Sequence, residues 1–165
     1  DSLGLSPKDI NTVILTHLHA DHIASLPEFG SSRIVLSRTG WNQAHTTSHP
    51  WLNPYPREII SWLDARSDQL RLVPDEGETL DGISFQWVGG HSACSQVVIL
   101  ETKAGRTAFS GDLVPFAENW EKRIPTGHYQ NLNEVAAAYE YLERFDAIVP
   151  GHDPEQPVWM EPAPL

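Results

Sequence analysis

A short apolar run that ends in a histidine cluster constrains this chain more than any other feature of its sequence. Val13–Thr16 is apolar or β-branched on both faces, which predicts a short buried strand. His17, His19, Asp21 and His22 follow within six residues. Because residues i and i+2 of an extended chain point to the same side, His17 and His19 are expected to bind one metal together. The other two lie where the chain turns and can face a second metal.

Three later positions repeat one pattern, in which an apolar strand and a small residue precede a side chain that can bind a metal. They are His91 after Ile83–Val88, Asp112 after Arg106–Ser110, and His152 after Ala147–Val149. Loops converge at strand ends along one edge of a sheet, so these side chains and the histidine cluster are expected to form one site. Imidazole nitrogen and carboxylate oxygen are the usual ligands of catalytic zinc. The competing interpretation, a polar loop with coincidental histidines, is disfavoured by four metal-competent side chains in six residues.

The other elements predict a layered α/β fold. Further strands are expected at Arg33–Ser37, Leu70–Val73, Glu78–Leu80 and Gln96–Thr102. Helices are expected as a single turn after Ser6, near Arg57–Leu63, and from a cap at Asn131 or Asn133 to Arg144. Residues 41–68 hold Trp41, Trp51, Trp62 and three prolines, and are interpreted as a covering insertion over the site mouth rather than a core layer.

Composition narrows the class of protein. The 165 residues suit one domain, 1–165, and the net charge of −11 disfavours a nucleic-acid partner. No apolar run approaches the ~20 residues that span a bilayer, so no membrane partner is expected. The single Cys94 excludes an internal disulfide and is interpreted as a core residue. The first residues lack the basic and apolar segments of a signal peptide, and a cytoplasmic location is expected.

The motif His-x-His-x-Asp-His, followed by Gly-His, Ser-Gly-Asp and Gly-His, resembles the metallo-β-lactamase superfamily from residue 12 to about 157. The resemblance implies an αββα sandwich with two divalent metal ions at one edge. Zinc is the expected metal, although iron, manganese and cobalt also suit these ligands. By the resemblance the first metal is held by His17, His19 and His91, the second by Asp21, His22 and His152, and Asp112 bridges both.

Within the superfamily, the resemblance points to the N-acyl-homoserine lactonase and pyridoxolactonase branch. It is carried by Glu118–Glu121, by Ile124-Pro125, and by residues 151–156. The zinc β-lactamases usually place a cysteine where Asp112 stands, and flavodiiron proteins place a glutamate at the position of His19. The expected activity is therefore hydrolysis of a small-molecule lactone or related ester by a metal-bound hydroxide. Two alternatives stay open: hydrolysis of a thiolester or other small ester, and a non-catalytic metal-binding domain.

The sequence departs from this branch at positions that bear on the substrate. Pro115 stands where the well-known lactonases carry a tyrosine three residues after the bridging aspartate. His128 or Tyr129 is a candidate replacement, and Trp41 is a further candidate substrate contact. Asp112 is expected to fix the metal spacing, and Asp21 to accept a proton during catalysis.

The segment before the histidine cluster is short compared with the family pattern. Because Val13–Thr16 is apolar on both faces, it is expected to be central in its sheet, with a neighbour on each side. Only twelve residues precede it, and they show no strand pattern. The chain is therefore expected to lack the N-terminal strands of the fold, and to be poorly soluble and nearly inactive on its own.

Overall fold

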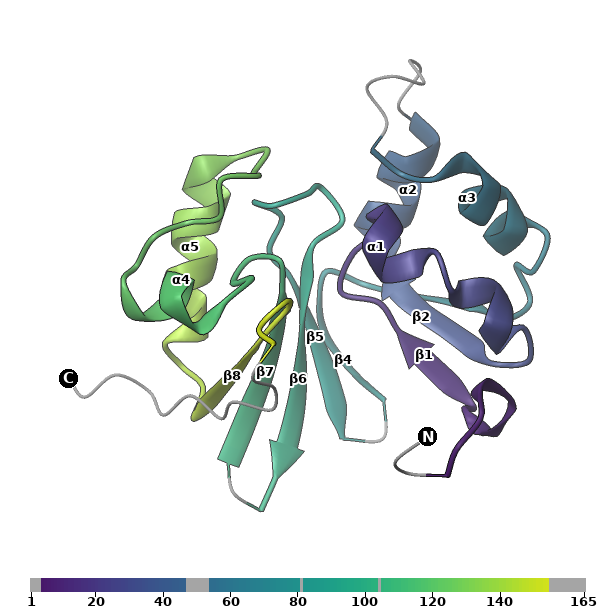
Figure 1. Cartoon of the computed structure of the whole chain (residues 1–165), viewed down its shortest axis with the longest axis horizontal. Coiled ribbons are helices and arrows are strands. Elements are labelled where there is room, and N and C mark those ends of the chain that lie inside the picture. The colour runs from purple at the N-terminus through teal and green to yellow at the C-terminus, as the bar shows by residue number, and fades with distance from the viewer. Residues whose placement is uncertain (1–3, 47–53, 81, 104, 155–165) are drawn as a thin grey trace.

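Two β-sheets face each other at the centre of the molecule, and helices cover the outer face of each (Figure 1). The computed structural model describes residues 4–46, 54–80, 82–103 and 105–154. The first sheet has the order β1 (Thr12–Ile14), β2 (Arg33–Ser37), β3 (Leu70–Val73), all parallel. The second has the order β4 (Glu76–Leu80), β5 (Ile83–Trp87), β6 (Gln96–Thr102), β7 (Gly105–Gly111), β8 (Ala147–Pro150). The predicted α/β sandwich is confirmed.

The second sheet is antiparallel except at one edge. β4 to β7 form successive antiparallel pairs, and β8 runs parallel to β7. As a result β7 and β8 end on the same side, with Gly111 paired to Pro150. The residues that follow these two strands, Asp112 and Gly151-His152, therefore emerge next to each other.

The helical layer over the first sheet is built from short elements. They are η1 (Pro7–Asp9), α1 (Ala20–Ile23), η2 (Leu26–Phe29), α2 (Arg38–Thr46) and α3 (Arg57–Asp64). The described residues of this range, 41–46 and 54–68, belong to this layer, because Ala44, Tyr55, Ile60 and Leu63 are buried in the same cluster as Leu18 and Leu36. The expectation that this range is not a core layer was wrong for its described part: the spacing of Ile60 and Leu63 on α3 buries one helix face. Trp51 lies outside the described residues.

The layer over the second sheet consists of α4 (Ala117–Glu121) and α5 (Leu132–Leu142). The Asn131 side chain caps α5 by accepting from the backbone amides of Asn133 and Glu134. Val135, Ala138, Tyr139 and Leu142 form the buried face of α5 against the sheet, as their spacing predicted. The expected end at Arg144 was two residues too late.

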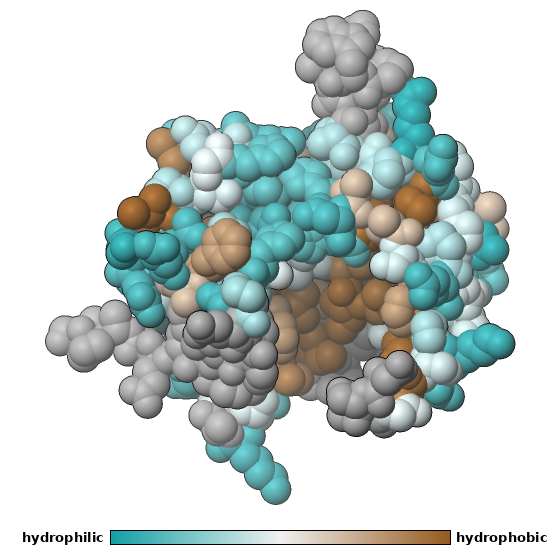
Figure 2. Space-filling model, viewed as in Figure 1, coloured by the Kyte–Doolittle hydropathy of each residue, from teal (hydrophilic) through white to brown (hydrophobic). Residues whose placement is uncertain are grey.

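A third cluster fills the space between the two sheets. Val35, Val73, Phe85 and Val98 are its buried members. Figure 2 shows apolar surface between the two halves of the molecule on the face viewed. Among the described residues, none of the helices combines the length and apolar content needed to cross a bilayer.

β1 lies at an edge of its sheet rather than at the centre. In the described part of the chain it pairs only with β2. Within the described residues the expected neighbour is present on one side, and the expectation of a second neighbour stays a prediction. Its apolar residues are explained by its two covered faces: Val13 packs on the helical layer, and Ile14 packs between the sheets.

Candidate metal centre

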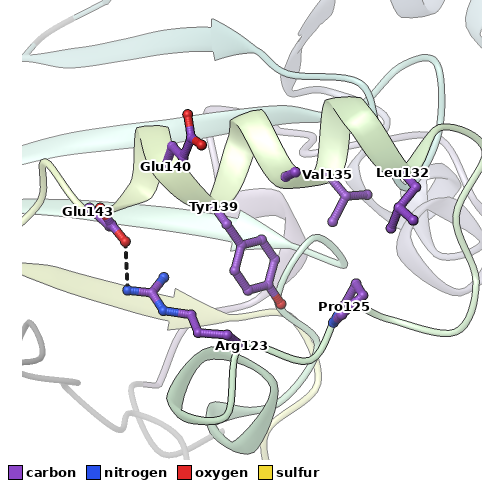
Figure 3. A pocket seen from close by; sticks show the side chains of 8 residues that line it. Arg123, Pro125, Leu132, Val135, Tyr139, Glu140 and Glu143 are labelled. Carbon is purple, nitrogen blue, oxygen red and sulfur yellow. Dashed lines mark ion pairs between the residues drawn. The ribbon is translucent and has the colours of Figure 1, made fainter.

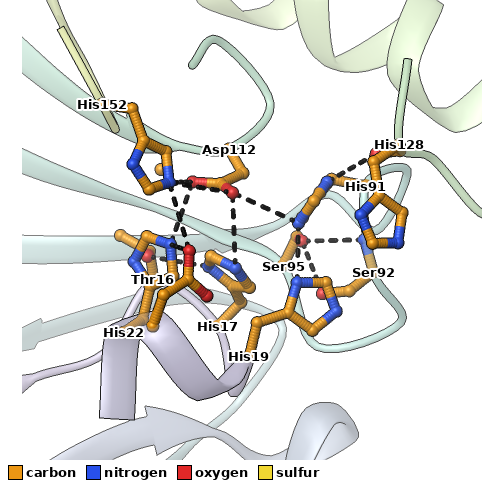
Figure 4. Close-up of polar contacts among 12 residues, drawn as sticks. Thr16, His17, His19, His22, His91, Ser92, Ser95, Asp112, His128 and His152 are labelled. Carbon is orange, nitrogen blue, oxygen red and sulfur yellow. Dashed lines mark hydrogen bonds and ion pairs between the residues drawn. The ribbon is translucent and has the colours of Figure 1, made fainter. Parts of the chain in front are cut away.

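The seven side chains singled out in the sequence meet at one edge of the sandwich (Figure 4). They come from the end of β1, from α1, from the loop between β5 and β6, and from the ends of β7 and β8. They form two groups, within each of which the ligand atoms lie within 4.8 Å of one another. The first group is His17, His19 and His91; the second is Asp21, His22, Asp112 and His152.

Backbone contacts across the two sheets fix the segment that carries the histidine cluster. The Gln96 amide donates to the Thr16 carbonyl at 2.9 Å, and the Gln96 side chain donates to the Leu15 carbonyl at 2.7 Å. Beyond this anchor the chain turns directly into α1, with His19 at its N-cap. The turn places His17 and His19 in one group and sends Asp21 and His22 to the other.

The first group is buried and its rings have fixed orientations. His17, His19 and His91 are 2%, 8% and 2% exposed. Nδ1 of His91 lies 2.7 Å from the His128 carbonyl, to which it can only donate. In the neutral ring this bond leaves Nε2 of His91 without a proton, and that atom lies 2.9 Å from Nδ1 of His19. Such a carbonyl partner is how proteins commonly set the tautomer of a metal-binding histidine.

Asp112 connects the two groups. Its Oδ1 lies 3.1 Å from Nε2 of His22 and 3.1 Å from Nε2 of His152. Its Oδ2 lies 3.6 Å from Nε2 of His91 and 3.9 Å from Nε2 of His17. One carboxylate therefore faces the nitrogens of both groups.

Several buried polar atoms at this edge have no hydrogen-bond partner. They are Nε2 of His17, His19 and His22, and Oδ1 of Asp112. Unpaired buried polar atoms are costly, and most proteins avoid them. Here Oδ1 of Asp112 and Nε2 of His22 are close but are not aligned for a hydrogen bond. Nitrogen and carboxylate donors gathered without pairing fit the coordination of divalent cations.

Comparisons with known proteins agree with this geometry. The family model of the metallo-beta-lactamase superfamily matches residues 1–152. The chain belongs to this superfamily. It is 24% identical over 159 residues to an N-acyl homoserine lactonase of Bacillus cereus, covering 93% of this chain and 60% of that protein. It is 58% identical over 64 residues, 37% of this chain and 23% of the relative, to the N-acyl homoserine lactonase AiiB of Agrobacterium fabrum.

A solved relative shares the fold at lower identity. The dizinc quorum-quenching lactonase AidC, solved in complex with a product, superimposes with a TM-score of 0.75 at 18% identity. The alignment covers 94% of this chain and 61% of that structure. The chain spans about 60% of the length of the Bacillus relative.

Burial and neighbouring charges shift the pKa of His22 and the pKa values of the first-group histidines in opposite directions. Burial lowers the pKa of His17 to about 2 and that of His19 to about 4, and it also lowers the pKa of His91. Burial acts on His22 in the same direction, but contacts with Asp112 outweigh it and raise the pKa of His22. The three histidines of the first group are therefore neutral at pH 7, the form that binds a metal.

The same histidines act in turn on Asp112. Burial favours its protonated form, but the contact with His22 and the nearby His17 and His152 rings outweigh burial and lower its pKa. The carboxyl group is therefore ionised at neutral pH. It supplies negative charge between the two groups, where cations would lie.

Close packing explains the small residues before the candidate ligands. Gly111 has φ +53°, and a Cβ there would lie 2.8 Å from Oγ1 of Thr16. A Cβ at Gly151 would lie 2.8 Å from Oδ1 of Asp112. A larger residue at either position would push apart the strand ends that carry the site.

The other sequence candidates occupy different positions relative to the two groups. The ring of His128 stacks on that of His19, with centroids 5.5 Å apart, and Tyr129 next to it is exposed. Trp41 packs on the buried cluster under α2, with its ring 4.4 Å from that of His45. Pro115 contributes its carbonyl, which accepts from the His152 amide at 2.8 Å.

Four residues near the site were missed by sequence reasoning. Two of them are aromatic: the Tyr55 ring lies 6.1 Å from that of His19, and the Phe116 ring lies 6.5 Å from that of His152. The other two make hydrogen bonds. Gln96 donates to the Leu15 carbonyl after β1, and Sγ of Cys94 accepts from the Leu18 amide. The expected core position of Cys94 holds, because it is 2% exposed. None of these four residues belongs to a recognisable sequence motif, because their roles depend on contacts between segments that are distant in the chain.

A separate cavity of about 440 Å³ lies between α5 and the loop before it (Figure 3). Leu132, Val135 and Tyr139 line it, and an Arg123–Glu143 ion pair of 2.8 Å lies at one end. It contains none of the seven candidate ligands.

Proposed function

We propose that this protein is a metal-dependent hydrolase that opens a lactone or a related ester. The observation that carries the proposal is the position of Asp112. Its carboxylate faces two groups of metal-competent side chains that include unpaired buried nitrogens. A structural polar cluster would instead pair these atoms with each other.

In this proposal each group holds one divalent ion, and zinc suits the ligand set best. His17, His19 and His91 hold the first ion; Asp21, His22 and His152 hold the second; Asp112 contacts both. Iron, manganese and cobalt also accept these ligands. Bound cations of this kind supply Lewis acidity, which polarises an ester carbonyl and lowers the pKa of water.

The residues of the chain supply orientation and proton transfer. The His128 carbonyl holds the His91 ring in one tautomer. The Asp21 side chain is 60% exposed, and its Oδ2 lies 3.6 Å from Nε2 of both His22 and His152. In the proposal it accepts a proton during catalysis, on the solvent side of the site.

Apolar side chains beside the site favour a substrate with an apolar part. Two of the five large apolar residues that are exposed in the described chain, Phe116 and Tyr129, lie close to residues of the site. Phe116 lies next to His152, and Tyr129 follows the His128 ring that stacks on His19. An acyl chain fits such a surface, and relatives of this chain are named N-acyl homoserine lactonases.

One test separates this function from its two alternatives. The zinc-loaded full-length protein would be assayed against N-acyl homoserine lactones, thiolesters and β-lactams, with metal content measured on the same sample. Ring opening of lactones well above the other rates is expected. Preferential thiolester cleavage would favour the small-ester alternative. Two bound metals without hydrolysis of any ester would favour a non-catalytic metal-binding domain.

A further inference from the structure

A buried hydrogen bond to a cysteine joins the two chain segments that supply the first group. The backbone amide of Leu18 donates to Sγ of Cys94 at 3.2 Å. Leu18 stands between His17 and His19, and Cys94 stands three residues after His91. The contact therefore ties both halves of the first group together, although 76 residues separate its partners.

Unpaired nitrogens of the two neighbouring histidines indicate that this contact lies next to a ligand site. Nε2 of His17 and of His19 is buried without a hydrogen-bond partner, on either side of the Leu18 amide. Rotation of the peptide units around Leu18 would turn both rings. We propose that Cys94, held by Tyr55, is a positioning residue that sets the angle between His17 and His19 for metal binding. This inference rests on the proposed metal centre.

The sulfur has little freedom to move. Its side chain is 2% exposed, Oγ of Ser92 lies 3.2 Å from Sγ, and the Tyr55 hydroxyl hydrogen-bonds to it. α2 lies directly on Cys94, because a Cβ at Gly40 would be 2.3 Å from the Cys94 Cβ. Burial also raises the pKa of the Cys94 thiol, which keeps it neutral. A neutral, fixed thiol acts as a hydrogen-bond acceptor for the amide and does not compete for the metal.

Tyr55 extends this arrangement to the helical layer. Its side chain is 4% exposed, and its ring lies 6.1 Å from the His19 ring with an interplanar angle of 30°. Tyr55 therefore has two contacts near the first group. Its hydroxyl hydrogen-bonds to Cys94, and its ring lies beside that of His19. Such partners of metal ligands typically change metal affinity by about 10–100-fold when they are removed.

The test compares metal binding in four variants of the full chain. Cys94→Ala removes the acceptor, Cys94→Ser keeps a shorter one, and Tyr55→Phe removes only the hydroxyl. Ile60→Val, which shortens a buried side chain of the same cluster, is the matched control for lost packing. Zinc affinity would be measured by competition with a chelator, and ligand geometry by the visible absorption of bound cobalt.

Cys94→Ala is expected to weaken the first site by about tenfold or more and to change the cobalt spectrum. Cys94→Ser should recover part of the affinity, and Tyr55→Phe should have a smaller effect in the same direction. The control should lower the melting temperature without changing affinity or spectrum. Wild-type affinity and spectrum in the Cys94 variants would overturn the inference. If Cys94→Ala does not fold, Cys94→Ser and Tyr55→Phe decide alone.

The proposed function has a separate outcome. A wild-type protein that binds metal but opens no ester would refute the hydrolase, while the affinity and spectrum comparisons would still decide the role of Cys94. A wild-type protein that binds no metal would refute both.

Discussion

Gly151 packs directly against the carboxylate of Asp112, since a Cβ at position 151 would lie 2.8 Å from Oδ1 and 2.9 Å from the Gly111 carbonyl oxygen. Gly151→Ala should therefore displace Asp112 and lower activity by about tenfold or more, with a stability loss of about 1–3 kcal/mol. Gly30→Ala is the control, because its nearest neighbour would be at an ordinary 3.5 Å. Turnover and metal content of both variants check this. Normal turnover in Gly151→Ala would mean that the carboxylate has room to adjust.

Asp112→Ala should reduce turnover more than His152→Ala. Asp112 faces nitrogens of both groups, whereas His152 belongs only to the second and is partly exposed. Loss of the carboxylate also leaves the repulsion between two cations unshielded. We expect the Asp112 variant to be at least about tenfold less active than the His152 variant, and to bind less metal. Equal metal content together with near-normal turnover would contradict the bridging role.

The metal-free protein should lose stability as the pH falls below about 6.5. The pKa values of His17 and His19 are lowered to about 2 and about 4, so in this range the unfolded chain binds more protons than the folded chain. The free energy of unfolding must then decrease with falling pH. His22, with its raised pKa, contributes in the opposite direction.

Denaturant titrations in the presence of a chelator, from about pH 8 to about pH 4.5, would measure this slope. His17→Gln should show a shallower slope, because the buried group that resists protonation is gone. An equal slope in the variant would show that His17 is not the source of the acid sensitivity.

Tyr129 should contribute to binding of an apolar substrate chain. It is 44% exposed and follows the His128 ring beside the first group. Tyr129→Ser should raise KM for long-chain acyl homoserine lactones by about three- to tenfold, and should affect short-chain substrates less, because each buried CH₂ contributes about 0.8 kcal/mol. Leu5→Ala, which changes another exposed apolar residue, is the control. An equal rise in KM for long and short chains would place the acyl chain elsewhere.

The sequence predicted most of the strands because their signals are local. Arg33–Ser37, Leu70–Val73 and Gln96–Thr102 were predicted with the bounds that the structure shows. Each is β-branched or apolar and is bounded by turn residues. α1 and α4 were missed because helices of four and five residues are too short to show a periodic pattern. α2 was missed because its mean hydropathy is low and its buried residues include Gly40.

The position of β1 shows what a local pattern leaves open. Apolar residues on both faces of a strand show that both faces are covered. Here the helical layer covers Val13, and the second sheet covers Ile14. The pattern carries no information about the strand's edges, which depend on pairing with distant segments. For β1 the two covered faces are confirmed, and a neighbour on its second edge stays a prediction.

The candidate ligands were predictable for a different reason. Histidine and aspartate at strand ends are chemically distinctive, and a glycine before each of the later three marks close packing. The residues that orient them are chemically ordinary. The sequence predicts Cys94 as a core residue and Gln96 as a strand residue. Their hydrogen bonds to Leu18 and Leu15 form only when the two sheets pack together.

His128 has two separable roles, one in its backbone and one in its ring. Its carbonyl accepts from Nδ1 of His91, while its ring stacks on His19 at 5.5 Å and meets the His91 ring edge-on at 5.4 Å. His128→Ala keeps the carbonyl and removes the ring. We therefore expect zinc affinity within about threefold of wild type, because the His91 tautomer is still fixed.

Turnover should respond differently from affinity. The His128 ring lies beside the first group, on the same loop as Tyr129, and in our proposal it is a candidate to replace the hydrogen-bond donor that Pro115 cannot supply. Loss of one such donor should lower kcat/KM for lactones by about 10²-fold or more. His128→Gln, which keeps a donor on a side chain of similar length, should recover part of this loss. Unchanged kcat/KM in His128→Ala would leave the ring with a packing role only, whereas a parallel fall in zinc affinity would show that the ring and not the carbonyl orients the histidines.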